Sequence, residues 1–116
     1  MKLAFLGAGN MAGAMIQSIL AADVLKGDEI LLVNARNPAH GKETAARLGI
    51  TAAEPAALRT ADAIVFAMKP QDFSAAAAMY RSYLENQLVL SIMAGISFKK
   101  LEKELGALPF IRVMPN

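Results

Sequence analysis

Two kinds of segment, which differ in the spacing of their hydrophobic and polar positions, alternate along the chain from end to end. Short apolar runs bounded by charge or glycine predict buried strands, and apolar residues recurring every three or four positions predict helices. The predicted strands are residues 2–6, 29–34, 62–68, 87–93 and 109–116. The predicted helices run from Asn10 to a stop at Gly27, from Pro38 to Gly49, over 70–84 and over 97–105. The stretch 50–61 predicts a short strand and then one or two helical turns that begin at Pro55.

The residues at the ends of these segments support the assignments. Asn37 is placed to cap the second helix, with Pro38 at its first position, and Gly49 ends it. Ser97 opens the last helix and Gly106 closes it.

Strand and helix segments alternate with short connections, which is typical of βαβ units whose parallel strands are joined by crossovers. Residues 62–68 are apolar on both faces, as in a central strand of a parallel sheet. No internal repeat or linker divides the 116 residues, so we expect one domain over residues 1–116. The fold class that follows is α/β, with a doubly wound, mainly parallel sheet in a three-layer αβα arrangement.

Composition narrows the class of protein. A hydrophobic share of 55% with 19% charged residues is typical of a globular chain. The apolar share has two explanations, many alanines or an apolar surface that a partner covers, and the sequence leaves both open. A net charge of +2 without a basic run argues against a nucleic-acid partner. The lack of cysteine excludes a disulfide scaffold and a cysteine metal site, and it is compatible with the cytoplasmic location that we expect.

The amino terminus has two interpretations, because Met1 and Lys2 followed by apolar residues resemble a secretory signal. The apolar run is interrupted at Gly7, Gly9, Asn10, Gly13 and Gln17. The rest of the chain also continues the pattern that this segment begins, so we expect the segment to belong to the fold. Elsewhere no apolar run approaches the ~18 residues that span a bilayer, and we expect no membrane partner.

Gly7, Gly9 and Ala12 match the pattern G-x-G-x-x-G/A, directly after a strand and at the start of a helix. In that context Gly7 permits a tight turn, Gly9 lets the backbone approach a pyrophosphate, and Ala12 with Gly13 lets the helix pack closely on the strand. The N–H groups and the dipole of the helix start favour an anion there. Small residues in this pattern also serve plain helix–strand packing. The βαβ context favours a Rossmann-like, dinucleotide-binding fold.

The end of the second strand bears on which dinucleotide binds. A domain that binds NAD carries Asp or Glu about 20 residues after the glycines, where this chain has Asn34, Ala35 and Arg36. Asn34 can donate to a 2′-phosphate and Arg36 can pair with it, a charge-assisted contact worth ~1.5 to 3 kcal/mol. We therefore expect NADPH (NADP) to bind and NADH to bind more weakly. Arg36 is also explained as an ordinary solvated loop charge.

Two further turns lie at the carboxyl ends of predicted strands, where ligands bind in open α/β sheets. One is AMKPQ from Ala67, in which Pro70 pushes the backbone of Lys69 to an extended conformation. The other is MAGIS from Met93, which contains Gly95. Each is equally explained as a plain strand-to-helix turn.

Other candidate chemistry is sparse. His40 lies in a polar helical region and is expected at the surface, and the seven methionines fall at apolar positions expected in the core. No Ser/His/Asp set, metal-ligand cluster or carboxylate pair stands out. We therefore expect neither a catalytic residue nor a metal site in this chain.

Four short motifs together point to a known family. They are FLGAGNMA from Phe5, AMKPQ from Ala67, SIMAG from Ser91 and RVMPN from Arg112. On these motifs the chain closely resembles the N-terminal domain of the pyrroline-5-carboxylate reductase family, over essentially all 116 residues. Four motifs in the right order and spacing are more specific than the glycine turn alone.

The resemblance implies an NADPH-dependent oxidoreductase that reduces 1-pyrroline-5-carboxylate to proline by hydride transfer, the last step of proline biosynthesis. Its pyrophosphate contacts would fall on the glycine turn, and its contacts to the adenosine ribose and phosphate on the end of the second strand. Its ribose and nicotinamide contacts would fall on the two later turns. The implied cofactor-binding residues are Leu6, Gly7, Ala8, Gly9, Asn10, Met11, Asn34, Arg36, Ala67, Met68, Lys69, Pro70, Ala94 and Gly95.

Three positions depart from the family pattern. Met68 stands where the family more often has valine, and Met93 where it often has alanine, and both changes stay apolar. Near the adenine, where the family often has Asn, this chain offers Glu54 or Pro55.

Members of the family continue past MPN with Thr-Pro and a helical domain that dimerises and supplies most of the imine site. This chain ends at Asn116, so we expect a cofactor half that is inactive alone. It would meet its small-molecule substrate, a cyclic imine acid, only with the missing domain, and would form a homo-oligomer when full length. Two alternatives remain: a free-standing, non-catalytic NADP(H)-binding regulatory module, and the cofactor domain of a related imine or 6-phosphogluconate-dehydrogenase-like reductase.

Overall fold

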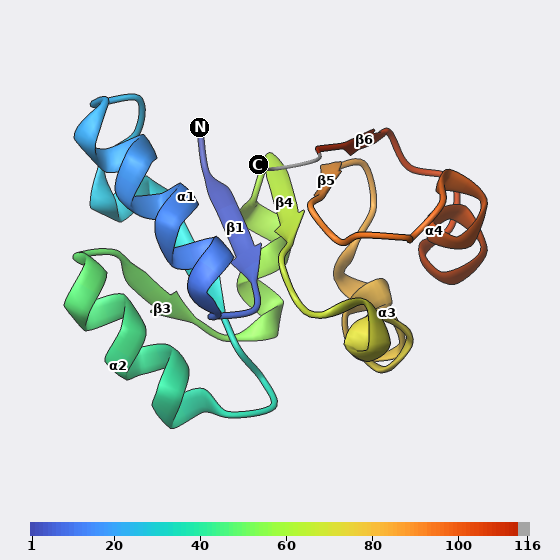
Figure 1. The fold of residues 1–116 in the computed structure, drawn as a ribbon, viewed down its shortest axis with the longest axis horizontal. Coiled ribbons are helices and arrows are strands. Elements are labelled where there is room, and N and C mark those ends of the chain that lie inside the picture. The colour runs from blue at the N-terminus through green and yellow to red at the C-terminus, as the bar shows by residue number, and fades with distance from the viewer. Residues whose placement is uncertain (114–116) are drawn as a thin grey trace.

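Six short apolar segments pair side by side into one parallel sheet (Figure 1). The strands are β1 (Leu3–Leu6), β2 (Ile30–Val33), β3 (Thr51–Ala53), β4 (Ala63–Phe66), β5 (Leu88–Ser91) and β6 (Phe110–Arg112). Their order across the sheet is β3-β2-β1-β4-β5-β6. The computed structural model describes residues 1–113, and within that range every strand pairing is parallel.

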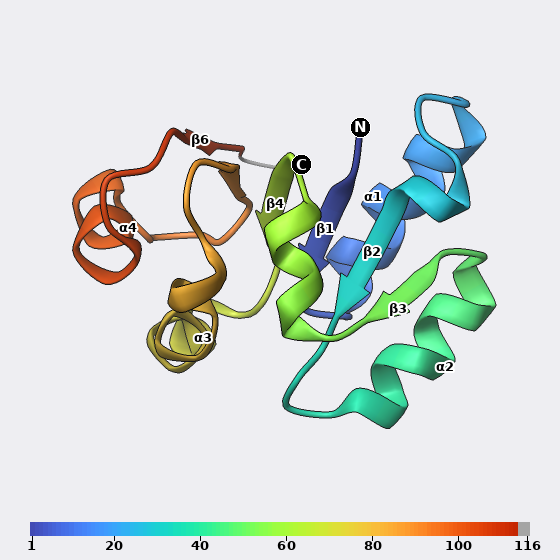
Figure 2. The same ribbon diagram turned by 180° about the vertical axis from the view of Figure 1, so that it is seen from behind.

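Helices cover both faces of the sheet, and Figure 2 shows the same layers from behind. The helices are α1 (Asn10–Ala21), α2 (Pro38–Leu48), α3 (Phe73–Tyr80) and α4 (Phe98–Leu105). Helices α1 and α2 pack on one face, and α3, α4 and a short 3-10 helix over Pro55–Thr60 pack on the other. The predicted doubly wound, three-layer αβα fold is confirmed.

Alternate residues of each strand feed two separate cores. Phe5 of β1 packs with Ile16 of α1 on one face, and both are fully buried. Phe66 of β4 points to the other face, where its ring meets the edge of Phe73 with the centroids 5.8 Å apart. Burying each such side chain stabilises the fold by about 1.5 to 3 kcal/mol. Because the central strands are buried on both faces, their sequences are continuous apolar runs rather than alternating ones.

The three central strands end at one level. Leu6 is paired with Val33 of β2 on one side and with Phe66 of β4 on the other. The chain then leaves β1 for the α1 face and leaves β4 for the α3 face. This divergence makes a crevice at the carboxyl edge of the sheet, which is where ligands bind in folds of this kind.

The first helix is shorter than predicted. It ends at Ala21 and not near Gly27, because Ala22 closes the last turn and Asp23 takes a left-handed conformation with φ 56°. The apolar Val24, which extends the helical pattern, is 68% exposed beyond that reversal. Gly27 instead begins a 3-10 turn, where a Cβ would collide with the carbonyl oxygen of Gly49.

The predicted helix over 70–84 is divided into α3 and two flanking 3-10 turns, Pro70–Asp72 and Arg81–Tyr83. The predicted strand over 109–116 is shorter, since β6 covers Phe110–Arg112 and residues 114–116 lie outside the described part.

The predicted ends of α2 and α4 are confirmed. The Asn37 side chain accepts a hydrogen bond from the His40 N–H at 3.2 Å, and that of Ser97 accepts one from the Lys100 N–H at 3.1 Å. Gly49 and Gly106 follow the last residues of α2 and α4.

In the described part of the chain, no helix combines the length and hydropathy needed to cross a bilayer.

Candidate cofactor site

The turn after β1 depends on glycine at position 7. Gly7 has φ +104°, and a Cβ there would lie 3.1 Å from the backbone of Ala67 and Met68. The Ala67 N–H donates to the Leu6 carbonyl at 2.9 Å, so the turns after β1 and β4 lie against each other. A side chain at position 7 would therefore face both a strained backbone and a steric contact.

The start of α1 leaves room for a ligand. Gly9 is the N-cap residue, makes no side-chain cap and has an extended backbone, and a Cβ there would meet no atom within 4 Å. The first backbone N–H groups of a helix have no partner within the helix, so this end offers donors and a positive dipole to an anion. These features fit a pyrophosphate at the glycine turn.

The two small residues after the turn have different surroundings. Ala12 is fully buried against the sheet, as its predicted packing role requires. Gly13 does not share that role, because it is half-exposed and a Cβ there would meet nothing within 4 Å. It faces the pocket beside the turn instead.

That pocket, of about 380 Å³, lies between the glycine turn and α2. Ala8, Gly9 and Asn10 line it from the turn, and His40 and Arg47 line it from α2. His40 is exposed, as predicted, but it shares a pocket with the glycine turn. The sequence interpretation missed Arg47, although residues 40, 44 and 47 have the spacing of one helix face.

The connection after β2 holds Asn34 in a defined orientation. Its Oδ1 accepts a hydrogen bond from the Asn37 N–H at 3.3 Å, so the amide nitrogen remains available as a donor. Helix α2 approaches closely here, since a Cβ on Gly41 would lie 3.0 Å from the Asn34 Cβ. Asn34 can therefore donate to an anion, as the sequence predicts.

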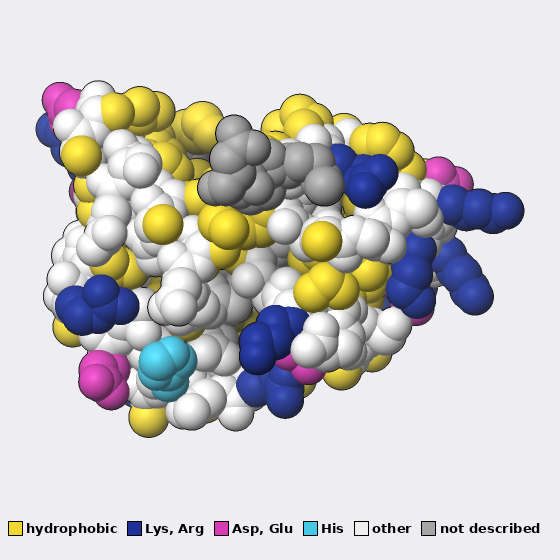
Figure 3. Space-filling model, viewed as in Figure 1, with side chains coloured by type: hydrophobic (Ala, Val, Ile, Leu, Met, Phe, Trp, Pro, Cys, Tyr) yellow, Lys and Arg dark blue, Asp and Glu magenta, His cyan; other side chains and the backbone are white. Residues whose placement is uncertain are grey.

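Arg36 is not an isolated loop charge. Its Nη1 lies 3.2 Å from Oδ1 of Asp72, in the connection after β4, and the two side chains are 64% and 35% exposed. Figure 3 shows Lys and Arg side chains gathered with an acidic one on this face, between the β2–α2 connection and α3. The sequence interpretation missed Asp72 because it lies far from Arg36 along the chain.

The connections after β1, β2 and β4 meet around a small pocket of about 40 Å³. Its lining includes four predicted site residues, namely Gly7, Asn34, Arg36 and Met68. It also includes Tyr80 of α3, whose hydroxyl accepts a hydrogen bond from the Ala35 N–H at 3.1 Å. Burial raises the pKa of Tyr80, while the Ala35 bond and the Arg36 charge act in the opposite direction. The tyrosine is therefore a neutral hydroxyl at physiological pH.

A larger pocket of about 500 Å³ lies between the ends of β2 and β3 and helix α2. Asn34 lines it too, so this pocket adjoins the previous one. Glu54 and Pro55, the residues proposed near an adenine, are also in the lining. Lys42 brings a positive charge that the sequence interpretation missed.

The remaining predicted residues are placed as follows. The Leu6 side chain is fully buried, so only its backbone reaches the crevice. Lys69 is exposed and extended, with φ −65° and ψ 145°, as its position before Pro70 predicts. Ala94 and Gly95 follow β5, one strand further from β1 than the turn after β4, and the pockets described here do not include them.

The expectation that the methionines are core residues was wrong for several of them. Met93 is buried, but Met1 and Met11 are 68% and 43% exposed. Met68 and Met79 line the small pocket beside Arg36. An unbranched apolar side chain is compatible with either position, so residue type alone does not separate core from pocket.

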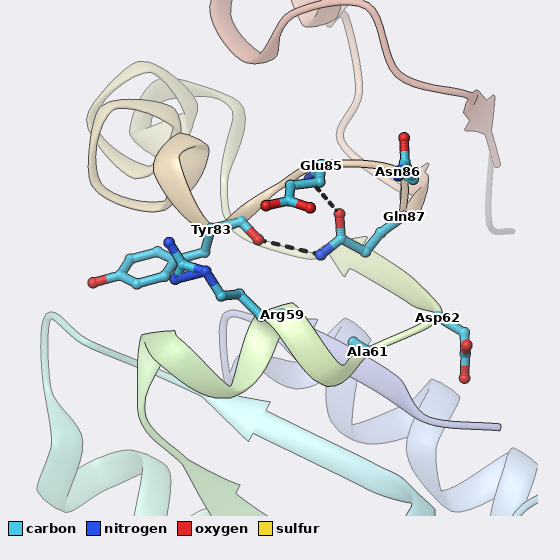
Figure 4. Close-up of a pocket in the computed structure, with 7 residues that line it drawn as sticks. All are labelled: Arg59, Ala61, Asp62, Tyr83, Glu85, Asn86 and Gln87. Carbon is cyan, nitrogen blue, oxygen red and sulfur yellow. Dashed lines mark hydrogen bonds between the residues drawn. The ribbon is translucent and has the colours of Figure 1, made fainter.

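A further pocket, of about 300 Å³, lies at the opposite edge of the sheet, near the starts of β4 and β5 (Figure 4). Several of its polar groups hold elements of the fold together. Gln87 donates to the carbonyls of Leu58 and Tyr83 at 3.0 and 3.2 Å, and Arg59 lies 4.9 Å from the Tyr83 ring centroid. The pocket is therefore a structural junction remote from the glycine turn.

Within residues 1–113, no group of three His, Asp or Glu side chains could hold a metal ion.

Comparison with known proteins covers nearly the whole chain. Pyrroline-5-carboxylate reductase 1 of Bacillus subtilis (strain 168) is 37% identical over an alignment of 119 positions, which covers 99% of this chain and 40% of the relative. Pyrroline-5-carboxylate reductase of Staphylococcus saprophyticus is 36% identical over an alignment of 120 positions, which covers 100% of this chain and 44% of the relative. The chain thus spans about two fifths of the length of these relatives.

Solved structures give the same result. The pyrroline-5-carboxylate reductase of Coxiella burnetii superposes with a TM-score of 0.83 at 28% identity, over 99% of this chain and 44% of that chain. The pyrroline carboxylate reductase of Plasmodium falciparum, solved with NADP bound, has a TM-score of 0.81 at 26% identity, over 100% of this chain and 42% of that chain. The resemblance predicted from the four motifs is confirmed.

A family model described as NADP oxidoreductase, coenzyme F420-dependent, matches residues 2–95. That span includes the glycine turn, the β2 end with Asn34 and Arg36, and the turns after β4 and β5. With this match over most of its length, the chain belongs to that family of NADP oxidoreductases.

Proposed function

We propose that this chain is the NADPH-binding part of a pyrroline-5-carboxylate reductase, which reduces 1-pyrroline-5-carboxylate to proline. The observation that carries the proposal is the meeting of the glycine turn with Asn34 and Arg36 at one sheet edge, around a common pocket. The relatives that match the whole chain carry this enzyme's name, and the Plasmodium falciparum structure holds NADP.

The pyrophosphate is assigned to the turn formed by Leu6, Gly7, Ala8, Gly9, Asn10 and Met11. The start of α1 supplies backbone N–H donors and a positive dipole end, and Gly9 leaves the space of a side chain open. Arg47, across the neighbouring pocket, adds a positive charge.

The 2′-phosphate of the adenosine is assigned to Asn34 and Arg36. The Asn34 amide is oriented as a donor by its bond to Asn37, and Arg36 offers a planar set of N–H groups that suits a phosphate. Lys42 lines the adjoining pocket, which Asn34 lines too. A charge-assisted contact of ~1.5 to 3 kcal/mol corresponds to a preference for NADPH over NADH of roughly ten- to a hundredfold.

The ribose and nicotinamide are assigned to the later turns, at Ala67, Met68, Lys69, Pro70, Ala94 and Gly95. NADPH, when bound, supplies the hydride. Ala67 and Met68 are half-buried, and no acid–base residue is assigned in this chain.

The substrate site is assigned to a part of the full-length enzyme beyond this cofactor-binding domain of residues 1–116. The imine must be held against the nicotinamide, and the relatives are more than twice as long as this chain. The proposal also includes homo-oligomerisation of the full-length enzyme and a cytoplasmic location, with which the lack of cysteine is compatible.

The test has two arms. In the first, the chain is titrated with NADPH and NADH by calorimetry, and NADPH is expected to bind roughly ten- to a hundredfold more tightly. Equal affinities would contradict the assignment of Arg36.

In the second arm, the chain replaces the matching region of the Bacillus subtilis relative, and the hybrid is assayed with 1-pyrroline-5-carboxylate and NADPH. The hybrid is expected to turn over, the isolated chain is expected not to, and a hybrid carrying Arg36→Asp serves as the matched control. A folded hybrid that binds NADPH but forms no proline would refute the proposed reaction. Turnover by the isolated chain would refute its role as a cofactor half.

A further inference from the structure

The ion pair between Arg36 and Asp72 joins two connections that flank β1. Arg36 follows β2, Asp72 follows β4, and β1 lies between these strands in the sheet. Both side chains line the small pocket that also contains Gly7 and Asn34. The pair therefore spans the part of the crevice assigned to the phosphates of the cofactor.

The Asp72 carboxylate is not held by its own helix. Asp72 ends the 3-10 turn Pro70–Asp72 with a helical backbone, φ −94° and ψ −5°, and its side chain makes no cap hydrogen bond to α3. Its carboxylate contacts the Arg36 guanidinium at 3.2 Å instead. The orientation of Asp72 thus follows the arginine rather than its own helix.

The charge balance of the pair affects phosphate binding. A guanidinium beside a carboxylate presents no net charge, so it attracts a phosphate less strongly than a solitary arginine would. The contact joins one nitrogen to one oxygen, and both groups are substantially exposed. A phosphate dianion, which can bind a guanidinium through two parallel hydrogen bonds, can displace a carboxylate held this way.

We propose that Asp72 is a specificity-determining residue that occupies Arg36 until a 2′-phosphate displaces it, and that it thereby weakens the preference for NADPH over NADH. This inference rests on the proposed function, because it requires Arg36 to meet the 2′-phosphate. NADH has no 2′-phosphate and leaves the ion pair in place. Asp72 therefore opposes the binding of NADPH and has little effect on NADH.

The test is Asp72→Asn, which keeps the shape of the side chain and removes its charge. NADPH affinity is expected to rise about two- to fivefold, the range that one exposed ion pair represents, with NADH affinity unchanged. The gain should shrink as salt is added, since screening already weakens the competing pair. Asp72→Ser, which removes the carboxylate by a different substitution, is expected to give the same gain.

Two controls isolate the contact. Glu102→Gln on α4 makes the same change in net charge at an exposed position outside the pocket and is expected to leave both affinities unchanged. In an Arg36→Gln background, Asp72→Asn is expected to raise NADPH affinity less than in the parent chain, because the competition for Arg36 is gone.

Three results would overturn the inference while leaving the proposed function intact, provided the parent chain prefers NADPH. They are unchanged NADPH affinity in Asp72→Asn, weaker NADPH binding in that variant (which would make Asp72 a support for Arg36), and an equal gain without Arg36. A parent chain that binds neither cofactor would overturn the proposed function and this inference together.

Discussion

Tyr80 and Ala35 are joined beside the small pocket, with the Ala35 N–H donating to the Tyr80 hydroxyl at 3.1 Å. The bond ties α3 to the connection after β2, just before Arg36. Tyr80 is only 4% exposed, so this backbone group is satisfied inside the protein by a side chain from a distant element. The bond thus fixes the base of the loop that carries the proposed phosphate contacts.

Tyr80→Phe should destabilise the chain by about 1 to 2 kcal/mol, because it removes the acceptor and leaves the Ala35 N–H without it. Urea unfolding measures the change. Tyr83→Phe is the matched control, since Tyr83 is half-buried and contributes a ring face to Arg59, which phenylalanine retains. Equal effects from the two variants would contradict a special role for the Tyr80 hydroxyl.

Alkaline pH should act through the same residue. Burial raises the pKa of Tyr80 above its ordinary value of 10.0, so above that pH the unfolded chain loses this proton more readily than the folded one. The corresponding stability is fully present below pH 10 and is lost as the pH rises toward the folded-state pKa. Unfolding free energies of the parent and Tyr80→Phe between pH 8 and about 11 should therefore converge, and parallel curves would contradict this.

The two glycines of the turn should separate folding from binding. Gly7→Ala forces a side chain into a positive φ and against the Ala67 backbone, and should destabilise the chain by about 1 to 3 kcal/mol. Gly9→Ala puts a Cβ into open space and should change stability by no more than about 1 kcal/mol. It should nevertheless weaken the binding of both cofactors at least about tenfold, because the added Cβ blocks the approach of the pyrophosphate. Thermal unfolding and titration distinguish the two, and tight cofactor binding by Gly9→Ala would contradict the assignment.

Arg36→Asp should reverse the cofactor preference. The variant removes the guanidinium and adds a second carboxylate beside Asp72, so NADPH binding should fall at least about tenfold while the ribose hydroxyl of NADH gains an acceptor. Titration with both cofactors gives the ratio. A variant that still favours NADPH would show that other groups recognise the phosphate.

Arg47→Gln should weaken the binding of both cofactors by the same factor, about two- to tenfold. Arg47 lines the pocket at the glycine turn, which faces the pyrophosphate common to NADPH and NADH. Its effect on the affinity ratio should therefore be nil, in contrast to Arg36→Asp. A selective loss of NADPH would place Arg47 near the 2′-phosphate instead.

The parts of the candidate site that local sequence determines were predictable. Gly7, Asn34 and Arg36 follow directly from the strand ends, because a glycine turn or a missing acid is visible within a few residues. The helix caps Asn37 and Ser97 were predictable for the same reason.

The groups that tertiary structure brings in were not predictable. Tyr80 meets Ala35 across 45 positions of sequence, and no local pattern encodes that pairing. Asp72 resembled an ordinary residue at a helix start, and its ion pair depends on how the sheet orders its strands. The early end of α1 arises from a left-handed Asp23, which an apolar Val24 in helical phase concealed.

The reversal at Asp23 has a practical consequence for experiments on this chain. Helix α1 begins at the glycine turn and runs back along the sheet, so residues 22–26 lie at the edge where the strands start. Val24 is 68% exposed there. A cysteine introduced at this position would be the chain's only thiol, and a fluorophore or surface tether coupled to it would leave the opposite edge open to nucleotides.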